Sequence, residues 1–251
     1  MTASRPFFVA EKLHKRFGDQ VVLESISLSF DEGTVSGIMG PNGAGKSTCF
    51  NVLTGLHKPD RGRVIFDGED ITGLSPEAIA RKGISRSFQI MNLFDEFTAI
   101  ENIMVALPQV RSGLSRLFWD TRGDSAVMDE AREVLGRVGL AGREQVRAGD
   151  LPYGQRRALE IGVALAAKPR IVFLDEPTQG LGSEGRARLA ELIANLQRSY
   201  TLVIIEHDMT FLFGLAQKIS VIHWGQVIAQ GTPQELMANE WVRASDLGKV
   251  A

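Results

Sequence analysis

A glycine-rich stretch, GPNGAGKS over residues 40–47, has residue types and spacing that directly suggest chemistry. It matches the pattern G-x-x-x-x-G-K-[ST] and lies between the apolar TVSGIMG and the helix-like CFNVLTGL, the strand–loop–helix context that the pattern needs. Glycines let successive backbone N–H groups point at phosphate oxygens, and the following helix N-terminus favours an anion. Lys46 would place a positive charge at the phosphates, and the Ser47 hydroxyl can bind Mg²⁺. A plain glycine-rich turn is the alternative, which the flanking strand and helix disfavour.

Carboxylates follow the buried-strand pattern IVFL of residues 171–174. Ligands of α/β folds bind at the carboxyl ends of strands, which is where Asp175 and Glu176 lie. Asp175 can hold a magnesium ion directly or through water, and Glu176 can orient or deprotonate an attacking water. A helix-capping role for this acidic pair is the alternative. His207 follows the strand pattern TLVIIE and is predicted to contact the γ-phosphate and water, although a lone histidine after a strand is as often structural.

A third stretch, LPYGQRRALEIGVALAAKP over residues 151–169, begins as a loop and continues as a helix. Its first five residues offer no acid, base or nucleophile. Gly154 would let a partner approach the backbone, and the helix N-terminus would favour an anion. Arg156 and Arg157 open this helix, where positive charge is unfavourable unless negative charge lies nearby. They are therefore either partners of such a charge or ordinary solvated surface residues.

The elements that would position these side chains alternate along the chain. FFVAEKLHKRFGDQVVLESISLSF is typical of antiparallel strands, and from Lys168 onward short apolar strands alternate with helices. Between them, TAIENIMVAL and SAVMDEAREVLGRVGL have apolar residues at helical spacing. We predict an α/β fold: a P-loop NTPase core with a mixed, largely parallel sheet, an N-terminal antiparallel β region and an inserted helical subdomain. One domain would span residues 1–251, with the nucleotide-binding core at 1–90 and 151–251 and the helical lobe at 91–150.

Composition and charge limit the classes of function. The 251 residues are 44% hydrophobic and 23% charged with a formal net charge of -2, so no overall attraction to nucleic acid or anionic lipid is expected. Cys49 is the only cysteine, which predicts a reduced compartment without an internal disulfide. The N-terminal residues do not resemble a secretory signal, and no apolar run reaches the about 18–20 residues of a membrane span. We expect a soluble, cytoplasmic protein, and any membrane role would have to come through a partner.

Taken together and in this order, the motifs resemble those of the ATP-binding subunits of ABC transporters, over essentially the whole chain. LPYGQ stands at the position of that family's signature motif, normally LSGGQ. The resemblance implies that this segment faces the γ-phosphate held by a second ATP-binding subunit, identical or related, so that two chains enclose two ATP molecules. It also implies an ATPase that drives transmembrane permease subunits from the inner face of the cell membrane.

The resemblance assigns roles residue by residue. Phe17 stands where the family stacks an aromatic ring on adenine; a buried strand aromatic is the alternative. Gln89, in RSFQ, matches the glutamine that contacts magnesium and water. The implied catalytic residues are Lys46, Gln89, Glu176 and His207, and the implied magnesium ligands are Ser47, Gln89 and Asp175. The implied ATP-binding residues are Phe17, Gly40, Pro41, Asn42, Gly43, Ala44, Gly45, Lys46, Ser47, Thr48, Tyr153, Gly154 and Gln155.

A narrower resemblance is to the importer group for branched-chain amino acids, urea and amides, which works indirectly with a periplasmic substrate-binding protein. It is carried by YGQRRALEI, IIEHDM, RSFQ and GTPQELMANEWVRASDLG. Two positions depart from the wider family: Pro152 replaces the signature serine, and Gly182 replaces the aspartate or asparagine after the catalytic glutamate. These changes either weaken activation across the dimer or are harmless.

Three rival functions stay open at this point. An ABC ATPase of DNA repair or translation would carry long coiled-coil insertions or two cores. A P-loop kinase for a small metabolite would leave LPYGQ and His207 without a role. An ATP-binding regulatory subunit would follow if Pro152 and Gly182 disabled hydrolysis.

Overall fold

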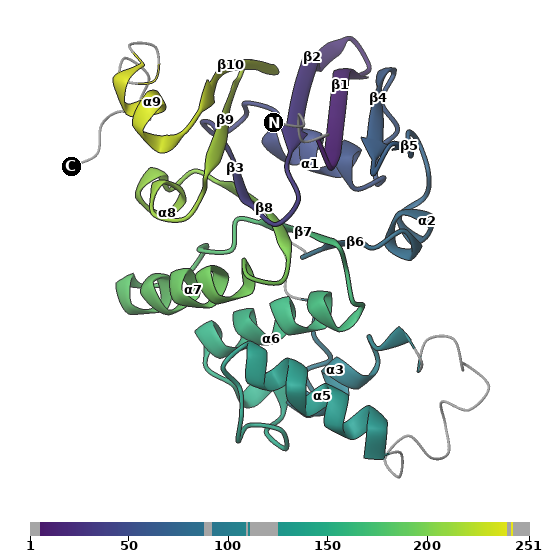
Figure 1. The fold of residues 1–251 in the computed structure, drawn as a ribbon, viewed down its shortest axis with the longest axis vertical. Helices are drawn as coiled ribbons and strands as arrows, with labels where there is room; N and C mark the ends of the chain where they lie inside the picture. Colours follow the sequence, from purple (N-terminus) through teal and green to yellow (C-terminus); the bar gives the residue numbers. More distant parts are fainter. Residues whose placement is uncertain (1–5, 88–91, 109, 111–124, 240–241, 243–251) are drawn as a thin grey trace, which may run out of the picture.

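The computed structural model describes residues 6–87, 92–108, 110, 125–239 and 242. Its centre is a six-stranded sheet in the order β10-β9-β3-β8-β7-β6 (Figure 1). Neighbouring strands of this sheet run parallel except for the antiparallel pair β9 and β10. The strands are β3 (Val35–Met39), β6 (Ile84–Arg86), β7 (Ile171–Asp175), β8 (Thr201–Glu206), β9 (Lys218–His223) and β10 (Gln226–Gly231).

A second, antiparallel sheet is built from the N-terminal part of the chain in the order β2-β1-β4-β5. The two long strands form a hairpin in which Phe8 lies opposite Phe30, and β4 pairs with the other side of β1. The predicted N-terminal antiparallel region is therefore confirmed. Its strands are β1 (Phe8–Phe17), β2 (Gln20–Phe30), β4 (Arg61–Phe66) and β5 (Glu69–Asp70).

Side chains of the central strands alternate between two apolar cores. On β7, Val172 and Leu174 belong to one cluster, while Ile171 and Phe173 belong to the other. Because successive side chains of a strand point to opposite faces, a strand buried on both faces is apolar throughout. The first cluster continues into the helices on one face, and the second into α1 and the antiparallel sheet. The central sheet therefore separates two layers that each cover one face.

Helices lie on both sides of the central sheet. Figure 1 shows α1 beside the antiparallel sheet at one end of the molecule and α3, α5 and α6 grouped at the other. Two helices begin with a capping box, in which Thr98 caps α3 and Thr232 caps α9 through reciprocal bonds with a glutamate. The described helices are α1 (Lys46–Leu53), α2 (Pro76–Arg81), α3 (Ala99–Met104), α5 (Ser125–Arg137), the 3₁₀ turn η1 (Ala148–Asp150), α6 (Tyr153–Ala166), α7 (Ser183–Leu196), α8 (Met209–Phe213) and α9 (Pro233–Ala238).

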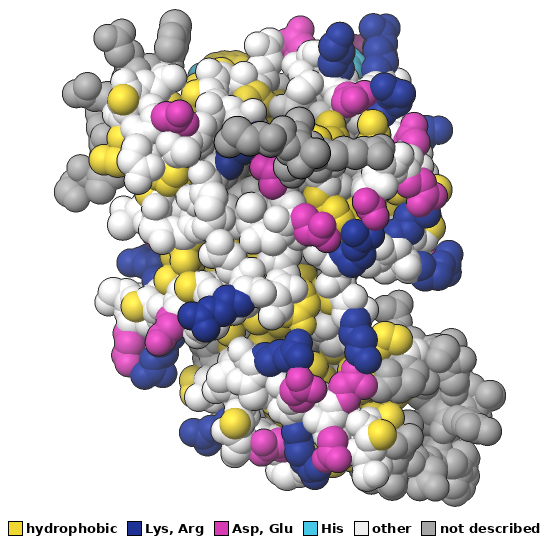
Figure 2. Space-filling view, in the orientation of Figure 1, with side chains coloured by type: hydrophobic (Ala, Val, Ile, Leu, Met, Phe, Trp, Pro, Cys, Tyr) yellow, Lys and Arg dark blue, Asp and Glu magenta, His cyan; other side chains and the backbone are white. Residues whose placement is uncertain are grey.

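The distribution of surface charge and the lengths of the helices limit the kinds of partner to consider. On the face shown in Figure 2, Lys and Arg side chains lie interspersed with Asp and Glu side chains. Within the described ranges, no helix combines the length and apolar character needed to cross a bilayer. The short elements α2 and β6 were not predicted from the sequence. Both are shorter than the windows in which periodicity becomes visible.

Candidate active site

Three neighbouring strand ends define the candidate site. β3 pairs in parallel with β8, bringing Met39 opposite Glu206, and β8 pairs in parallel with β7, bringing Asp175 opposite Ile205. The residues that follow these strands therefore meet at one edge of the sheet: Gly40, His207 and Glu176. Sequence reasoning predicted this convergence from the rule that parallel strands end together.

The segment of residues 40–48, here called the phosphate loop, needs glycine at defined positions. A Cβ atom on Gly40 would lie 2.1 Å from the carbonyl oxygen of Ile222, so no side chain fits there. Gly45 has φ of +100° and caps the start of α1 without a side-chain hydrogen bond. The first N–H groups of α1 consequently carry no side-chain cap, an arrangement typical of anion sites.

Lys46 lies inside this loop. Its side chain is buried, and Nζ donates hydrogen bonds to the carbonyl oxygens of Gly40 at 2.8 Å and Pro41 at 2.9 Å. Burial lowers the pKa of Lys46, and the nearby carboxylates of Glu176, Asp175 and Glu206 oppose that shift. The loop's cation and the acidic residues at the strand ends thus form one electrostatic group.

Asp175 ends β7 next to this cation. Burial, and then the charge of Glu176, raise the pKa of Asp175 to about 6, against the opposing influence of Arg86, Arg157 and Lys46. A divalent cation would relieve this crowding of negative charge, and a carboxylate with the Ser47 hydroxyl is the oxygen donor set that Mg²⁺ prefers. In the described part of the chain, no group of three or more His, Cys, Asp and Glu side chains could hold a metal. The Asp175 carboxylate and the Ser47 hydroxyl would fit a magnesium ion.

Glu176 adopts an unusual backbone conformation. Its φ is +43°, in the left-handed region that residues other than glycine rarely adopt. Its N–H donates to the carbonyl oxygen of Ile205 at 2.9 Å, and its own carbonyl accepts from the N–H of Gln179 at 3.1 Å. The carboxylate Oε1 lies 3.7 Å from Nδ1 of His207. The geometry brings the two predicted catalytic side chains face to face.

Glu206 is a site residue that sequence reasoning missed. It is fully buried at the end of β8, and its Oε1 accepts hydrogen bonds from the backbone N–H of Thr178 at 2.8 Å and from the Thr178 hydroxyl at 2.5 Å. Its Oε2 accepts from the N–H of His207 at 3.1 Å. A glutamate closing an otherwise apolar strand was the signal, since buried carboxylates need such partners. Glu206 joins the segment after Glu176 to the segment that carries His207.

The segment of residues 151–155, here called the signature segment, leads into α6. Pro152 precedes the helix without a side-chain cap, and its carbonyl oxygen accepts from the N–H groups of Gln155 and Arg156. The Tyr153 hydroxyl donates to the carbonyl oxygen of Gln179 at 3.0 Å. The signature segment is therefore bonded to the loop that follows Glu176.

The two arginines that open α6 differ in their surroundings. Arg156 forms an ion pair with Asp95 at 2.6 Å and is partly exposed. Arg157 is only 2% exposed and pairs with Glu160 at 2.5 Å. The interpretation of Arg157 as solvated surface is therefore wrong. The negative charge that its position requires is supplied by Glu160, one helical turn further along α6.

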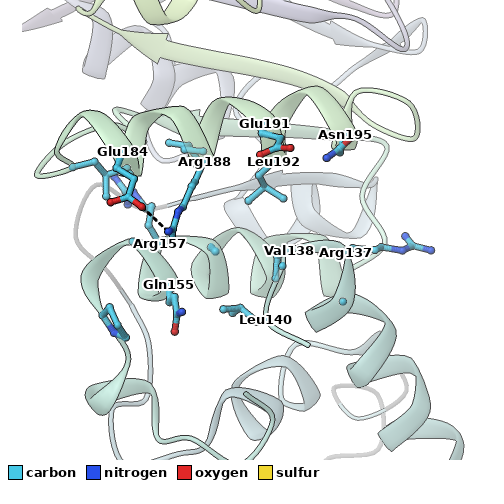
Figure 3. A pocket seen from close by; sticks show the side chains of 18 residues that line it. Arg137, Val138, Leu140, Gln155, Arg157, Glu184, Arg188, Glu191, Leu192 and Asn195 are labelled. Atoms are coloured by element: carbon cyan, nitrogen blue, oxygen red, sulfur yellow. Dashed lines mark hydrogen bonds and ion pairs between the residues drawn. The ribbon is translucent and has the colours of Figure 1, made fainter. Parts of the chain in front are cut away.

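A cavity of about 560 Å³ lies behind the signature segment, between α6, α7 and the end of α5 (Figure 3). Pro152, Gly154 and Gln155 line one side of it. The opposite side includes the ion pair between Glu184 and Arg188 of α7, 2.6 Å apart. Open space thus lies between α6 and α7 here, and Arg157, which also lines this cavity, connects α6 to the loop after Glu176.

Two further predicted residues have different outcomes. Phe17 ends β1 with 45% of its surface exposed, and its ring lies 5.3 Å from the ring of His57 and 5.3 Å from Nζ of Lys15. The alternative of a buried strand aromatic is therefore wrong. Gln89 lies outside the described residues.

The ABC transporter family model matches residues 23–179, which include the phosphate loop, the signature segment, and Asp175 and Glu176 at the end of β7. The chain belongs to the ABC transporter family. LivG of Salmonella typhimurium, a high-affinity branched-chain amino acid transport ATP-binding protein, is 38% identical over 253 residues, covering 98% of this chain and 99% of LivG. BraF of Pseudomonas aeruginosa, with the same description, is 39% identical over 253 residues.

Solved ABC cassettes share the whole fold. The ADP conformation of MJ1267, an ATP-binding cassette of an ABC transporter, superposes with a TM-score of 0.85 at 31% identity, covering 95% of this chain and 97% of that one. A nucleotide-free ATP-binding cassette gives 0.84 at 29% identity, covering 98% and 100%. The predicted family and fold class are thus confirmed. Membership also argues against the metabolite kinase, because the ATP-binding proteins of ABC transporters are ATPases.

Proposed function

We propose that this ABC ATPase drives the uptake of branched-chain amino acids. Near full-length similarity to LivG and BraF, with no large insertion or second core, is the observation that carries the proposal. Other amino acids, urea and amides are the alternative cargoes. The chain works with transmembrane permease subunits and, through them, with a periplasmic substrate-binding protein. Its place is cytoplasmic, on the inner face of the cell membrane.

The nucleotide site divides the work among the strand ends. The phosphate loop and Lys46 bind the β- and γ-phosphates. Glu176 accepts a proton from the water that attacks the γ-phosphate, and His207, 3.7 Å away, contacts the same phosphate and orients that water. Ser47 and Asp175, together with Gln89, would hold Mg²⁺, and a bound Mg²⁺ would supply positive charge next to the phosphates.

A second ATP-binding chain, identical or related, completes each site. Phe17, half-exposed at the end of β1, stacks on adenine in its own chain. Tyr153, Gly154 and Gln155, at the uncapped start of α6, face the partner's γ-phosphate. In this proposal, residues 1–251 form a single domain. Its nucleotide-binding core spans residues 1–90 and 151–251, and its helical lobe, residues 91–150, contacts the permease.

The base assignment is tested by Glu176→Gln. Hydrolysis should fall about 10²–10⁴-fold, because a general base is lost, while ATP still binds. Size-exclusion chromatography with Mg-ATP should then show a trapped dimer that disappears on washing with ADP. Glu191→Gln, at an exposed position on α7, is the matched control and should hydrolyse ATP at the wild-type rate. Wild-type hydrolysis by Glu176→Gln would contradict the assignment.

The cargo is tested by reconstitution with candidate permease subunits from the same organism. Proteoliposomes holding the complex, the substrate-binding protein and internal Mg-ATP should accumulate leucine, isoleucine and valine. Competition by unlabelled urea or acetamide at equal concentration should have no effect. Uptake of urea or an amide without leucine uptake would replace the proposed cargo.

A further inference from the structure

Arg157 is the largest fully buried side chain in the described part of the chain. Taking a guanidinium out of water is costly unless its donors are paired, and a buried ion pair seldom stabilises a fold more than an apolar pair of similar volume. A buried arginine therefore points to a requirement for particular hydrogen bonds. Those bonds identify what the side chain is for.

Among the described residues, the donors of Arg157 reach two different parts of the structure. Nη1 donates to Oε2 of Glu160 at 2.5 Å, which neutralises the charge within α6. Nη2 donates to the carbonyl oxygen of Glu176 at 2.8 Å, and Nε donates to the carbonyl oxygen of Pro177 at 3.2 Å. The planar guanidinium presents these donors in a fixed fork, which a lysine ammonium cannot reproduce. Arg157 thus joins α6 to two successive carbonyls of residues 176–179, here called the base loop.

The carbonyl that Arg157 holds belongs to the residue with the left-handed backbone. Glu176 has φ of +43°, and its peptide groups are held by Ile205 on the strand side and Gln179 within the loop. Such conformations persist only where surrounding contacts determine them. Because the backbone sets the direction of the Cα–Cβ bond, the contact from Arg157 also helps to set where the carboxylate points. Tyr153 adds a second bond from the start of α6, to Gln179.

We propose that Arg157 is a positioning residue for ATP hydrolysis, which holds the base loop from α6 so that the Glu176 carboxylate faces the attacking water. The inference rests on the proposed role of Glu176 as the base. The position of Glu176, the proposed base, therefore depends on the placement of α6 in the same chain. Glu160 completes the device by neutralising the buried guanidinium.

The first test is Arg157→Lys, compared with Arg137→Lys, the same change in an exposed ion pair on α5. Arg157→Lys keeps a positive charge near Glu160 but cannot span both carbonyls. We expect kcat for ATP to fall about 10–100-fold, as for a misplaced catalytic group, with KM and the affinity for a fluorescent ATP analogue unchanged. Arg137→Lys should leave all three quantities at wild-type values. Equal losses in kcat and ATP affinity, or no loss, would overturn the proposal.

The second test is a double-mutant cycle in which single-turnover hydrolysis is measured for Arg157→Lys, Glu176→Gln and the double variant. If Arg157 acts through Glu176, adding Arg157→Lys to Glu176→Gln should cause no further loss. Losses that multiply would overturn the positioning role while leaving Glu176 as the base. If Glu176→Gln alone hydrolyses ATP normally, the base assignment fails first, which separates the two claims.

A third variant addresses folding. Arg157→Met combined with Glu160→Leu replaces the buried ion pair with apolar side chains, a change that folds often tolerate. A structural role predicts that the refilled core restores hydrolysis. The positioning role predicts that the protein keeps its Tm and binds ATP while kcat stays at least about ten-fold low. Restored kcat in this folded variant would overturn the proposal.

Discussion

The phosphate loop and the signature segment lead into helices with similar N-termini, but the basic side chains of the two helices have different partners. Each leads into a helix without a side-chain cap, α1 after Gly45 and α6 after Pro152, and neither helix has an acidic residue in its first turn. Both helix N-termini therefore favour an anion. In local terms the two segments are versions of one anion-binding device.

The two helices differ in the groups that their basic side chains contact. Lys46 folds back into its own loop and sits within the influence of Glu176 and Asp175, so the phosphate-loop side is assembled from one chain. On α6, Arg157 turns inward to the base loop and Arg156 pairs with Asp95. Both arginines at the start of α6 thus bond to groups of their own chain. The start of α6 keeps backbone N–H groups without a side-chain cap, which fits its proposed role as half of a site.

Among the changes that test this comparison, a substitution in the phosphate loop should reduce ATP hydrolysis most. Lys46→Ala removes the cation from the cradle, and we expect hydrolysis to fall at least about 10²–10³-fold, because a preorganised charge at the phosphates is lost. Steady-state phosphate release measures it. Lys82→Ala, in an ion pair with Glu69, is the control and should retain full activity. Near-normal hydrolysis by Lys46→Ala would mean that another group supplies the charge.

Asp175→Asn, next to the phosphate loop, should make the fold more stable while abolishing hydrolysis. The folded-state pKa of Asp175 is raised to about 6, so its charged form destabilises the fold at neutral pH, and this penalty fades as pH falls below about 6. Without Mg²⁺ at pH 7.5, we expect Asp175→Asn to raise the free energy of unfolding by on the order of 2 kcal/mol, and Tm by a few degrees.

Thermal unfolding in EDTA at several pH values checks this prediction. The gain of Asp175→Asn over the wild type should shrink between pH 7.5 and pH 4.5, where the wild-type carboxyl is protonated too. Magnesium-dependent hydrolysis should be lost in the same variant. A variant less stable than the wild type at pH 7.5 would contradict the sign.

A smaller effect is expected on the signature side from Tyr153→Phe. The change removes the hydrogen bond from the Tyr153 hydroxyl to the Gln179 carbonyl. Because Tyr153 is about half-exposed and water can replace this bond, the loss should lower the free energy of unfolding by about 1 kcal/mol or less. We expect kcat to fall about two- to five-fold with ATP binding unchanged. Tyr200→Phe, which loses a hydrogen bond with Arg137, is the matched control. A loss of ATP affinity in Tyr153→Phe would show that the hydroxyl acts on nucleotide binding rather than on the loop after Glu176.

The smallest effect is expected from Pro152→Ser. A serine places a hydroxyl at the start of α6, where it can cap the helix or reach an anion, and the loss of the proline ring offsets part of that gain. We expect Tm to change by less than about 2 °C and hydrolysis to rise about two-fold at protein concentrations that favour dimers. Pro152→Ala separates the hydroxyl from the ring. An equal rise in Pro152→Ala would assign the effect to backbone freedom alone.

Much of the site could be predicted from the sequence because its signals are local. The glycines and Lys46 stand in consecutive positions, and apolar runs that end in Asp175 and His207 place those residues at one sheet edge through a general rule of parallel sheets. The family followed from the order of these motifs, since each alone is less specific. The α2 helix and β6 were missed because six and three residues carry no readable period.

What the sequence by itself determined is the set of elements and the chemistry at their ends, because backbone torsions, strand alternation and helix polarity act between near neighbours in the chain. Tertiary structure decided which charges meet. Arg156 and Arg157 are adjacent and identical in type, yet one lies at the surface and the other inside, because a 100° step around α6 turns the second toward the base loop. Glu206 bonds to Thr178, 28 residues away in the chain, only because β7 and β8 pair in parallel. Contacts between distant segments depend on how sheets and helices pack, and no local pattern records them.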